Sequence, residues 1–277
     1  MKRLCSLMLL SVLVVLGCER ENSTSTETHP AYDKLIKSAN VSIMGQDFME
    51  YEFRYDTKGR LASMNLQIND SYYDSPIHMN CTYEYSESKV AVTVVGDDAY
   101  GGLNNDYVAE YLFDADGIAY SCKREGYVAT QMLHLGTQES YIYENGYIER
   151  KYVTGINDNR TSFSVEYDWH SGNLQKIICE PGDESDFVYT YTYDNRIDKS
   201  NLDLVKLMYY LNLYRGGHYT ADKSVFKGMS SQNLVKTYKG ESEVLEFDYK
   251  LDAEGYVLEV IVKMGGSPFM ILSLKYK

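Results

Sequence analysis

The 277-residue chain is acidic, with 40 Asp and Glu residues against 27 Lys and Arg residues and a net charge of −13 at pH 7. This balance leaves no basic patch that could follow phosphates, so it excludes a nucleic-acid partner. An acidic surface instead suits solubility beside an anionic membrane.

The first seventeen residues resemble a lipoprotein signal peptide. Lys2 and Arg3 precede an apolar run, Leu7 to Leu16, that is too short to span a bilayer. The run ends in Leu-Gly-Cys at Cys18, which resembles a bacterial lipobox, where the chain is cut before the Cys and its thiol is acylated. We expect residues 1–17 to be removed, which moves the net charge from −13 to −15, and Cys18 to carry the lipid. The alternative is an ordinary secretory signal in which Cys18 has no role.

Residues 18–34 form a predicted tether. The stretch is polar and has no apolar period, so it buries too little surface to fold. The acidic residues directly after Cys18 resemble the export tags of Bacteroidetes surface lipoproteins. We therefore expect a lipid anchor in the outer membrane, and leave open whether the protein faces the periplasm or the cell surface.

The rest of the chain, residues 35–277, repeats one hairpin. In its clearest copy, aromatic residues alternate with charged ones over Tyr51–Tyr55, Asp56–Gly59 has the composition of a type I turn, and apolar residues alternate again over Met64–Ile68. Further copies follow at 81–95, 111–122, 141–147, 165–174, 189–194 and 245–262, with a last strand at 269–276. About a dozen or more strands predict a single all-β domain: a curled antiparallel meander, either a half-barrel or barrel-like.

One segment near 201–214 breaks this rhythm. Ser200–Asp203 resembles a capping box, and Leu204, Leu207, Met208 and Leu211 recur at helical spacing. We expect one helix here, which covers a mouth of the curled sheet or packs inside it.

The repeated aromatic-x-Tyr-Asp-x-x-Gly pattern is similar to the YD repeats of bacterial surface proteins. With the tether, the run Tyr191–Asn195 and the segment Ser231–Lys236, it resembles a Bacteroidetes lipoprotein family classed as a domain of unknown function with a porin-like β fold. The resemblance covers about residues 35 to 277 and implies a scaffold without a known activity. Glu144 in place of Asp, and a turn at 84–89 without Gly, depart from the pattern.

No catalytic motif stands out, so we predict that the protein is not an enzyme and uses no metal or cofactor. Oxygen-rich residues at 96–106 could serve a calcium ion, but a solvated hairpin tip explains them better. Cys81, Cys122 and Cys179 are expected to be buried as small apolar side chains. One disulfide with a thiol left over is the alternative in an oxidising compartment.

Tyrosine is unusually frequent, with 28 Tyr against 8 Phe. The tyrosines share the apolar face of the strands, opposite charged residues, which argues against a membrane-spanning barrel. A buried tyrosine needs a partner for its hydroxyl, so this face is either a tyrosine-rich core or the lining of a ligand site. The candidate lining residues are Tyr83, Tyr85, Tyr189, Tyr191, Tyr193 and Met208.

The sequence predicts a lipid-anchored cell-envelope binding or scaffold protein that holds an apolar or amphipathic small molecule inside the curled sheet. One alternative is a surface glycan-binding lipoprotein that uses exposed tyrosines and Trp169 as stacking platforms. The other is a purely structural or protein-interaction lipoprotein.

Overall fold

The structure is a computed structural model and describes residues 34–69, 75–96, 106–128, 133–155, 163–180, 187–200, 231–240 and 243–277. The described residues form sixteen strands: β1 (Ile36–Ile43), β2 (Gln46–Tyr55), β3 (Leu61–Ile68), β4 (Ile77–Tyr85), β5 (Lys89–Gly96), β6 (Asp106–Phe113), β7 (Ala119–Val128), β8 (Leu133–Glu144), β9 (Tyr147–Gly155), β10 (Phe163–His170), β11 (Asn173–Glu180), β12 (Phe187–Ile197), β13 (Asn233–Lys239), β14 (Val244–Leu251), β15 (Val257–Met264) and β16 (Ser267–Tyr276).

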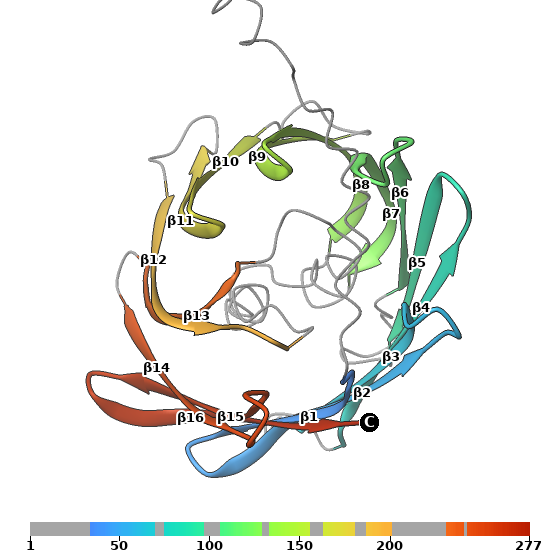
Figure 1. Cartoon of the computed structure of the whole chain (residues 1–277). Coiled ribbons are helices and arrows are strands. Elements are labelled where there is room, and N and C mark those ends of the chain that lie inside the picture. The colour runs from blue at the N-terminus through green and yellow to red at the C-terminus, as the bar shows by residue number, and fades with distance from the viewer. Residues whose placement is uncertain are drawn as a thin grey trace, which may run out of the picture. The chain divides into compact units, whose positions relative to one another are not determined.

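Each strand pairs with its sequence neighbours, and β1 pairs with β16, so the meander closes into a barrel (Figure 1). Every pairing is antiparallel, from β1 with β2 around the ring to β15 with β16. The predicted all-β antiparallel meander is confirmed, and the half-barrel alternative is replaced by full closure. The predicted helix at 201–214, with Met208, lies outside the described residues, as do Cys18, the signal peptide and almost all of the tether.

The repeated turns form because an Asp side chain caps its own backbone. The amide nitrogens of Lys58 and Arg60 donate to Asp56 Oδ1 at 2.8 and 2.9 Å, and the turns that begin at Asp114 and Asp252 have the same two bonds. Gly59 adopts φ 77°, a conformation that a residue with a Cβ takes only with strain. The Asp-x-x-Gly carboxylates are therefore structural, as the sequence predicts.

The two faces of the wall differ in chemistry. Along β4, Ile77, Met79, Cys81 and Tyr83 are buried, and the residues between them are exposed. Buried side chains from β1 through β16 belong to one core cluster on the inside of the barrel. The outward strand positions carry charges: Glu52, Arg54, Glu84, Glu246, Asp248 and Lys250. Exposed apolar residues such as Val108, Leu112 and Ile142 lie among these charges. This mixed outer face differs from that of a membrane-spanning barrel, whose outer belt is apolar.

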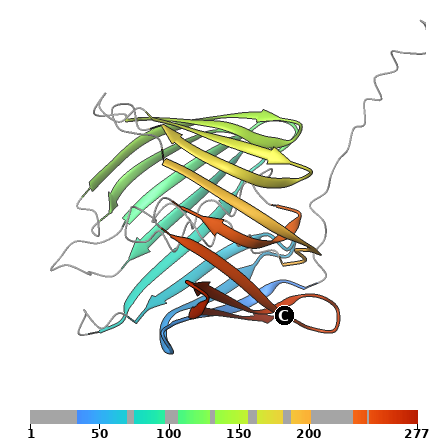
Figure 2. The same cartoon turned by 90° about the vertical axis from the view of Figure 1, so that its left-hand side faces the viewer.

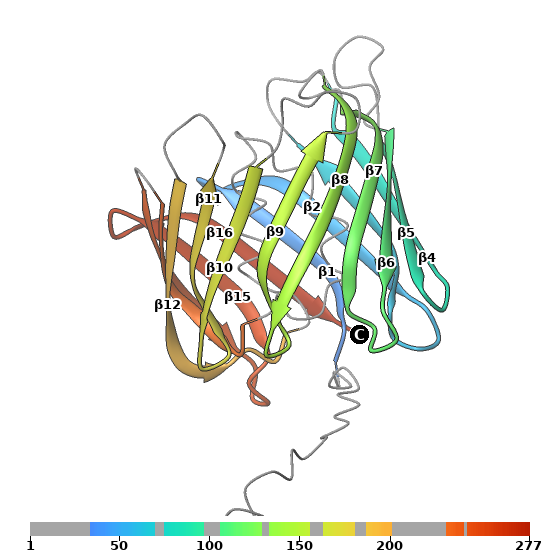
Figure 3. The ribbon, with the colours of Figure 1, turned by 90° about the horizontal axis from the view of Figure 1, so that it is seen from above.

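The even-numbered strands end at one rim, which we call the tight-turn rim (Figures 2 and 3). Six connections there, which follow β2, β4, β6, β8, β10 and β14, contain only two to five residues each. The chain enters β1 and leaves β16 at the same rim. Among the described residues, no helix is long and apolar enough to cross a membrane.

An aromatic residue lies at or near the end of every even-numbered strand, close to the tight-turn rim: Tyr55, Tyr85, Phe113, Tyr143, Trp169, Tyr193, Tyr249 and Tyr276. Six of them donate to a backbone carbonyl of the preceding strand, at 2.6 to 2.9 Å: Tyr55 to Ile36, Tyr85 to Leu61, Trp169 to Ile148, Tyr193 to Leu174, Tyr249 to Val235 and Tyr276 to Val257. Burial raises the pKa of Tyr85 to about 12, so its hydroxyl remains a donor at neutral pH. Phe could pack here but could not donate, which explains part of the tyrosine excess.

The rim hydroxyls provide a matched stability test. Replacing Tyr249→Phe removes the donor to the Val235 carbonyl and should lower the free energy of unfolding by about 1–2 kcal/mol. The Tyr143 hydroxyl is buried without a hydrogen-bond partner, so Tyr143→Phe should be neutral or stabilising. Denaturant unfolding followed by circular dichroism measures both. Equal losses in the two variants would show that these hydroxyl bonds do not stabilise the rim.

None of the three cysteines in the described part of the chain forms a disulfide. Cys81 and Cys122 are buried and Cys179 is partly buried, on β4, β7 and β11 respectively. This agrees with their predicted role as small apolar side chains, and the disulfide alternative is not formed.

Candidate binding site at the tight-turn rim

The tyrosines proposed as a ligand lining lie on opposite walls. Tyr83 and Tyr85 are on β4, and Tyr189, Tyr191 and Tyr193 are on β12, eight strands away in a ring of sixteen (Figure 1). The rings of Tyr189 and Tyr191 pack on Tyr238 of β13, with centroids 5.9 and 5.5 Å apart. The hydroxyls of Tyr85 and Tyr193 bond to the backbone. The two groups thus share the interior face but do not meet in one constellation.

A buried ion pair lies on β7 and β8, and the sequence analysis missed it. Arg124 is fully buried and forms an ion pair with Glu139. The Arg124 guanidinium also donates to the Tyr111 hydroxyl at 2.7 Å. The Glu139 carboxylate accepts a hydrogen bond from the Tyr141 hydroxyl at 2.5 Å. Burial, together with the Glu139 charge, raises the pKa of Tyr141 well above its usual value. The sequence did contain a signal: Arg124 follows Cys122 by two residues on the same strand, so both side chains point to the inward face. Since both charges are paired, we interpret this network as structural.

The wall of the barrel opens between β9 and β10. These strands pair at only four positions, where Phe163–Glu166 face Arg150–Val153, and they separate from there toward the tight-turn rim. Trp169 spans the gap, and its indole nitrogen donates to the Ile148 carbonyl at 2.8 Å. A cavity of about 410 Å³ occupies the opening, which we call the rim cleft. Its lining residues are Glu144, Asn145, Tyr147, Glu149, Arg150, Glu166, Tyr167, Asp168, Trp169, Ser171, Gly172 and Ile178.

Bulges and tight turns border the cleft on both sides. The β8–β9 pairing shifts register between Ile142 and Tyr143, and the β10–β11 pairing shifts between Asp168 and Trp169. Such bulges bend a strand and increase its twist. Both flanking hairpins close through two residues with positive φ, 52° and 81° at Asn145–Gly146, and 50° and 74° at Ser171–Gly172. The same register shifts occur near the ends of β2, β6 and β14, so these features shape the rim of the cleft and do not by themselves open it.

One wall of the rim cleft is aromatic and the remainder is acidic. The Trp169 and Tyr147 rings stack with their centroids 4.7 Å apart, and the Tyr147 hydroxyl accepts from Gln232. Arg150 pairs with Glu166. Three further carboxylates, Glu144, Glu149 and Asp168, are exposed and have no hydrogen bond or ion pair within the described ranges. Four carboxylates against one guanidinium give this lining a net charge of −3.

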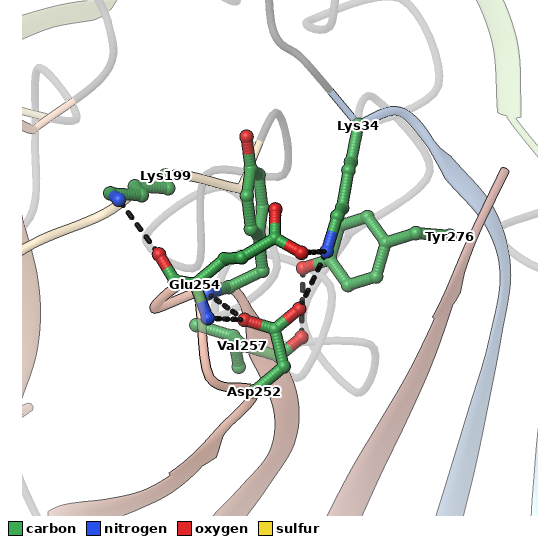
Figure 4. Close-up of polar contacts among 7 residues, drawn as sticks. Lys34, Lys199, Asp252, Glu254, Val257 and Tyr276 are labelled. Carbon is green, nitrogen blue, oxygen red and sulfur yellow. Dashed lines mark hydrogen bonds and ion pairs between the residues drawn. The ribbon is translucent and has the colours of Figure 1, made fainter.

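A second polar cluster lies where the chain enters the barrel (Figure 4). Lys34 Nζ donates to Asp252 Oδ2 and Glu254 Oε1, both at 2.8 Å, and lies 4.8 Å from the centre of the Tyr256 ring. Lys199 Nζ donates to the Glu254 carbonyl at 2.7 Å. Hydrogen bonds to the two carboxylates raise the pKa of Lys34, and the bond from Lys34 lowers that of Asp252. These charges are satisfied by one another, so the cluster fixes the start of the barrel and offers no open site.

The comparisons with known proteins agree with this architecture. The chain matches the model of a "Domain of unknown function (DUF4595) with porin-like fold" over residues 53–259. The chain belongs to this family. No curated protein matches it. The Bacteroidetes porin-like resemblance predicted from the hairpin repeats is thereby confirmed.

Two crystal structures of porin-like proteins resemble this member of the porin-like family. One, from Bacteroides uniformis, has a TM-score of 0.61 and 16% identity and covers 87% of this chain and 96% of its own. The other, from Bacteroides vulgatus, has a TM-score of 0.56 and 14% identity and covers 88% of this chain and 99% of its own. At these identities the likeness establishes the shared fold. The family match spans β9 and β10, so the rim cleft lies within the family domain.

The structure revises the role expected for Trp169 as an exposed stacking platform. Its side chain is partly buried, packs against the core, bonds to the Ile148 carbonyl and presents its ring to Tyr147 in the cleft. In the described part of the chain, no three His, Cys, Asp or Glu side chains are placed to hold a metal ion. Acidic residues at outward positions of β9 and β10 were visible in the sequence, but the opening between the strands was not.

Proposed function

We propose that this porin-like family member is a lipid-anchored envelope protein that binds a small ligand in the rim cleft. The observation that supports this role is the 410 Å³ cavity with an aromatic wall and unpaired carboxylates. Cavities of a few hundred Å³ with a few convergent polar groups are typical of small-molecule sites. In this proposal the protein binds its ligand and does not catalyse a reaction on it.

The cleft supports a binding role better than the barrel interior does. Inward residues such as Val92, Val94, Leu174 and Ile177 are fully buried, and they pack with their neighbours in one core cluster. Rim tyrosine hydroxyls are already bonded to backbone carbonyls. We therefore propose that the ligand binds in the opening of the wall, and not inside the curled sheet as the sequence predicts.

The charged outer face supports a barrel that stands in water beside the membrane and does not form a pore. The chain enters the tight-turn rim at Lys34, sixteen positions after Cys18. An extended chain of that length reaches about 55 Å at most. A lipid on Cys18 would thus tether the barrel through the start of β1 at the tight-turn rim.

A blocking substitution tests the cleft. Glu149 is an exposed strand residue that lines the cavity, so Glu149→Trp should fill the opening without disturbing the core. We expect a ligand found by thermal shift, from a panel of organic cations, oligosaccharides and fatty acids, to stabilise the natural protein by mass action. The shift should vanish in Glu149→Trp and persist in the control Glu84→Trp, an exposed position on β4, five strands away from β9.

The panel separates the competing roles. A fatty-acid shift that survives Glu149→Trp would place the ligand inside the barrel and overturn the cleft proposal. Absence of any shift would favour the structural or protein-interaction alternative. Circular dichroism of both Trp variants confirms that they fold.

A further inference from the structure

The rim cleft has more hydrogen-bond acceptors than donors. Glu144, Glu149 and Asp168 contribute carboxylates that have no ion-pair partner within the described part of the chain. The only cationic lining residue, Arg150, already pairs with Glu166. A ligand that uses these carboxylates must therefore bring its own donors, and a positive charge would strengthen each bond.

The aromatic wall favours the same kind of ligand. Tyr147 and Trp169 stack with their centroids 4.7 Å apart, so each covers one face of the other, and the outer faces of the stack carry negative electrostatic potential. Cations bind to such faces, Trp being the strongest, and gain most where the site is partly shielded from water. The Trp169 indole N–H is occupied by the Ile148 carbonyl, so the ring contributes its face and not its donor.

We propose that the rim cleft binds an organic cation, that is, an ammonium, amidinium or guanidinium group on a flat apolar body. The inference rests on the proposed binding role of the cleft and names its ligand class. The flat body lies against an outer face of the Tyr147–Trp169 stack, and the cationic group faces Glu149 and Asp168. Anionic ligands are repelled by a lining with a net charge of −3.

The chain supplies its own reporter for the test. Trp169 is the single tryptophan, so changes in tryptophan emission report directly on the cleft. The purified protein is titrated with benzamidine, benzamide and benzoate, three flat molecules of nearly equal shape and different charge. Benzamidine should change the emission with the tightest Kd, benzamide should bind at least about tenfold more weakly, and benzoate should not bind. Added salt should weaken benzamidine binding, because the carboxylates are exposed.

Isosteric variants test which carboxylates of the cleft contact the cationic group of the ligand. Glu149→Gln and Asp168→Asn should each raise the Kd for benzamidine about fivefold, close to the upper value for an exposed charge pair, and the double variant should raise it further. Glu84→Gln, on β4 and outside the cleft, should leave the Kd unchanged.

Three results would overturn the cation proposal. They are equal Kd values for benzamide and benzamidine, a double variant that binds benzamidine like the natural protein, and no emission change with any of the three. If a neutral sugar binds and is lost only in Glu149→Trp, the cleft remains the binding site and the inferred charge of the ligand is wrong.

Discussion

Removal of the Glu139 carboxylate should destabilise the barrel by about 3–5 kcal/mol, because it leaves Arg124 buried without its countercharge. Glu139→Ala also strands the Tyr141 hydroxyl, which donates to Glu139 at 2.5 Å. Guanidinium unfolding followed by circular dichroism measures the loss as a lower midpoint at an unchanged slope.

Two controls separate the buried charge from ordinary truncation. Breaking the exposed pair between Lys89 and Glu110 with Lys89→Ala should cost less than about 1 kcal/mol. The double variant Arg124→Met and Glu139→Leu should lose less than Glu139→Ala alone, because neither charge is then left unpaired. A double variant less stable than the single one would show that the network stabilises the barrel beyond the pairing of its charges.

Replacement of Cys18→Ala should release the protein from the membrane fraction. The expectation follows from the lipobox-like end of the signal sequence, since the thiol of Cys18 is the predicted site of acylation. One acyl chain binds a membrane only marginally, so stable anchoring requires the several chains of a lipoprotein. Fractionation followed by a carbonate wash measures the change. Cys122→Ala, at a buried position of the barrel wall, is the control and should remain in the membrane fraction.

A Cys18→Ala protein that resists the carbonate wash would contradict the lipoprotein prediction. Such a result would also mean that the barrel is not tethered through Cys18. The ligand site would be unaffected, because the rim cleft depends only on the geometry of β9 and β10.

The distribution of charged residues on the barrel wall bears on whether the porin-like fold implies a pore. The fold is porin-like, yet Glu84 and Lys250 lie at exposed positions of strands whose alternate residues form the core. A pore needs a polar interior and an apolar belt. The interior of this barrel is mainly apolar, and its outer face mixes charges with exposed apolar residues such as Val108 and Ile142. The shared architecture alone therefore does not establish channel activity.

The sequence by itself determined the features that depend on near neighbours in the chain. Alternation at period two assigned Tyr51 and Tyr83 to the buried face, and the Asp56 turn followed from side-chain bonds to amides two and four residues away. The hairpin repeats also predicted the family, which the match over residues 53–259 confirms. These features need no knowledge of the distant parts of the chain.

Only the tertiary structure decided the features that depend on distant pairing. Closure joins β1 to β16, more than two hundred residues apart, and alternation looks the same in an open sheet and a closed barrel. The Arg124–Glu139 pair became visible only when the β7–β8 register was known. The rim cleft required knowing where β9 and β10 stop pairing. No local pattern of residue types encodes the end of a ladder between two strands, so the candidate site could not be found from the sequence.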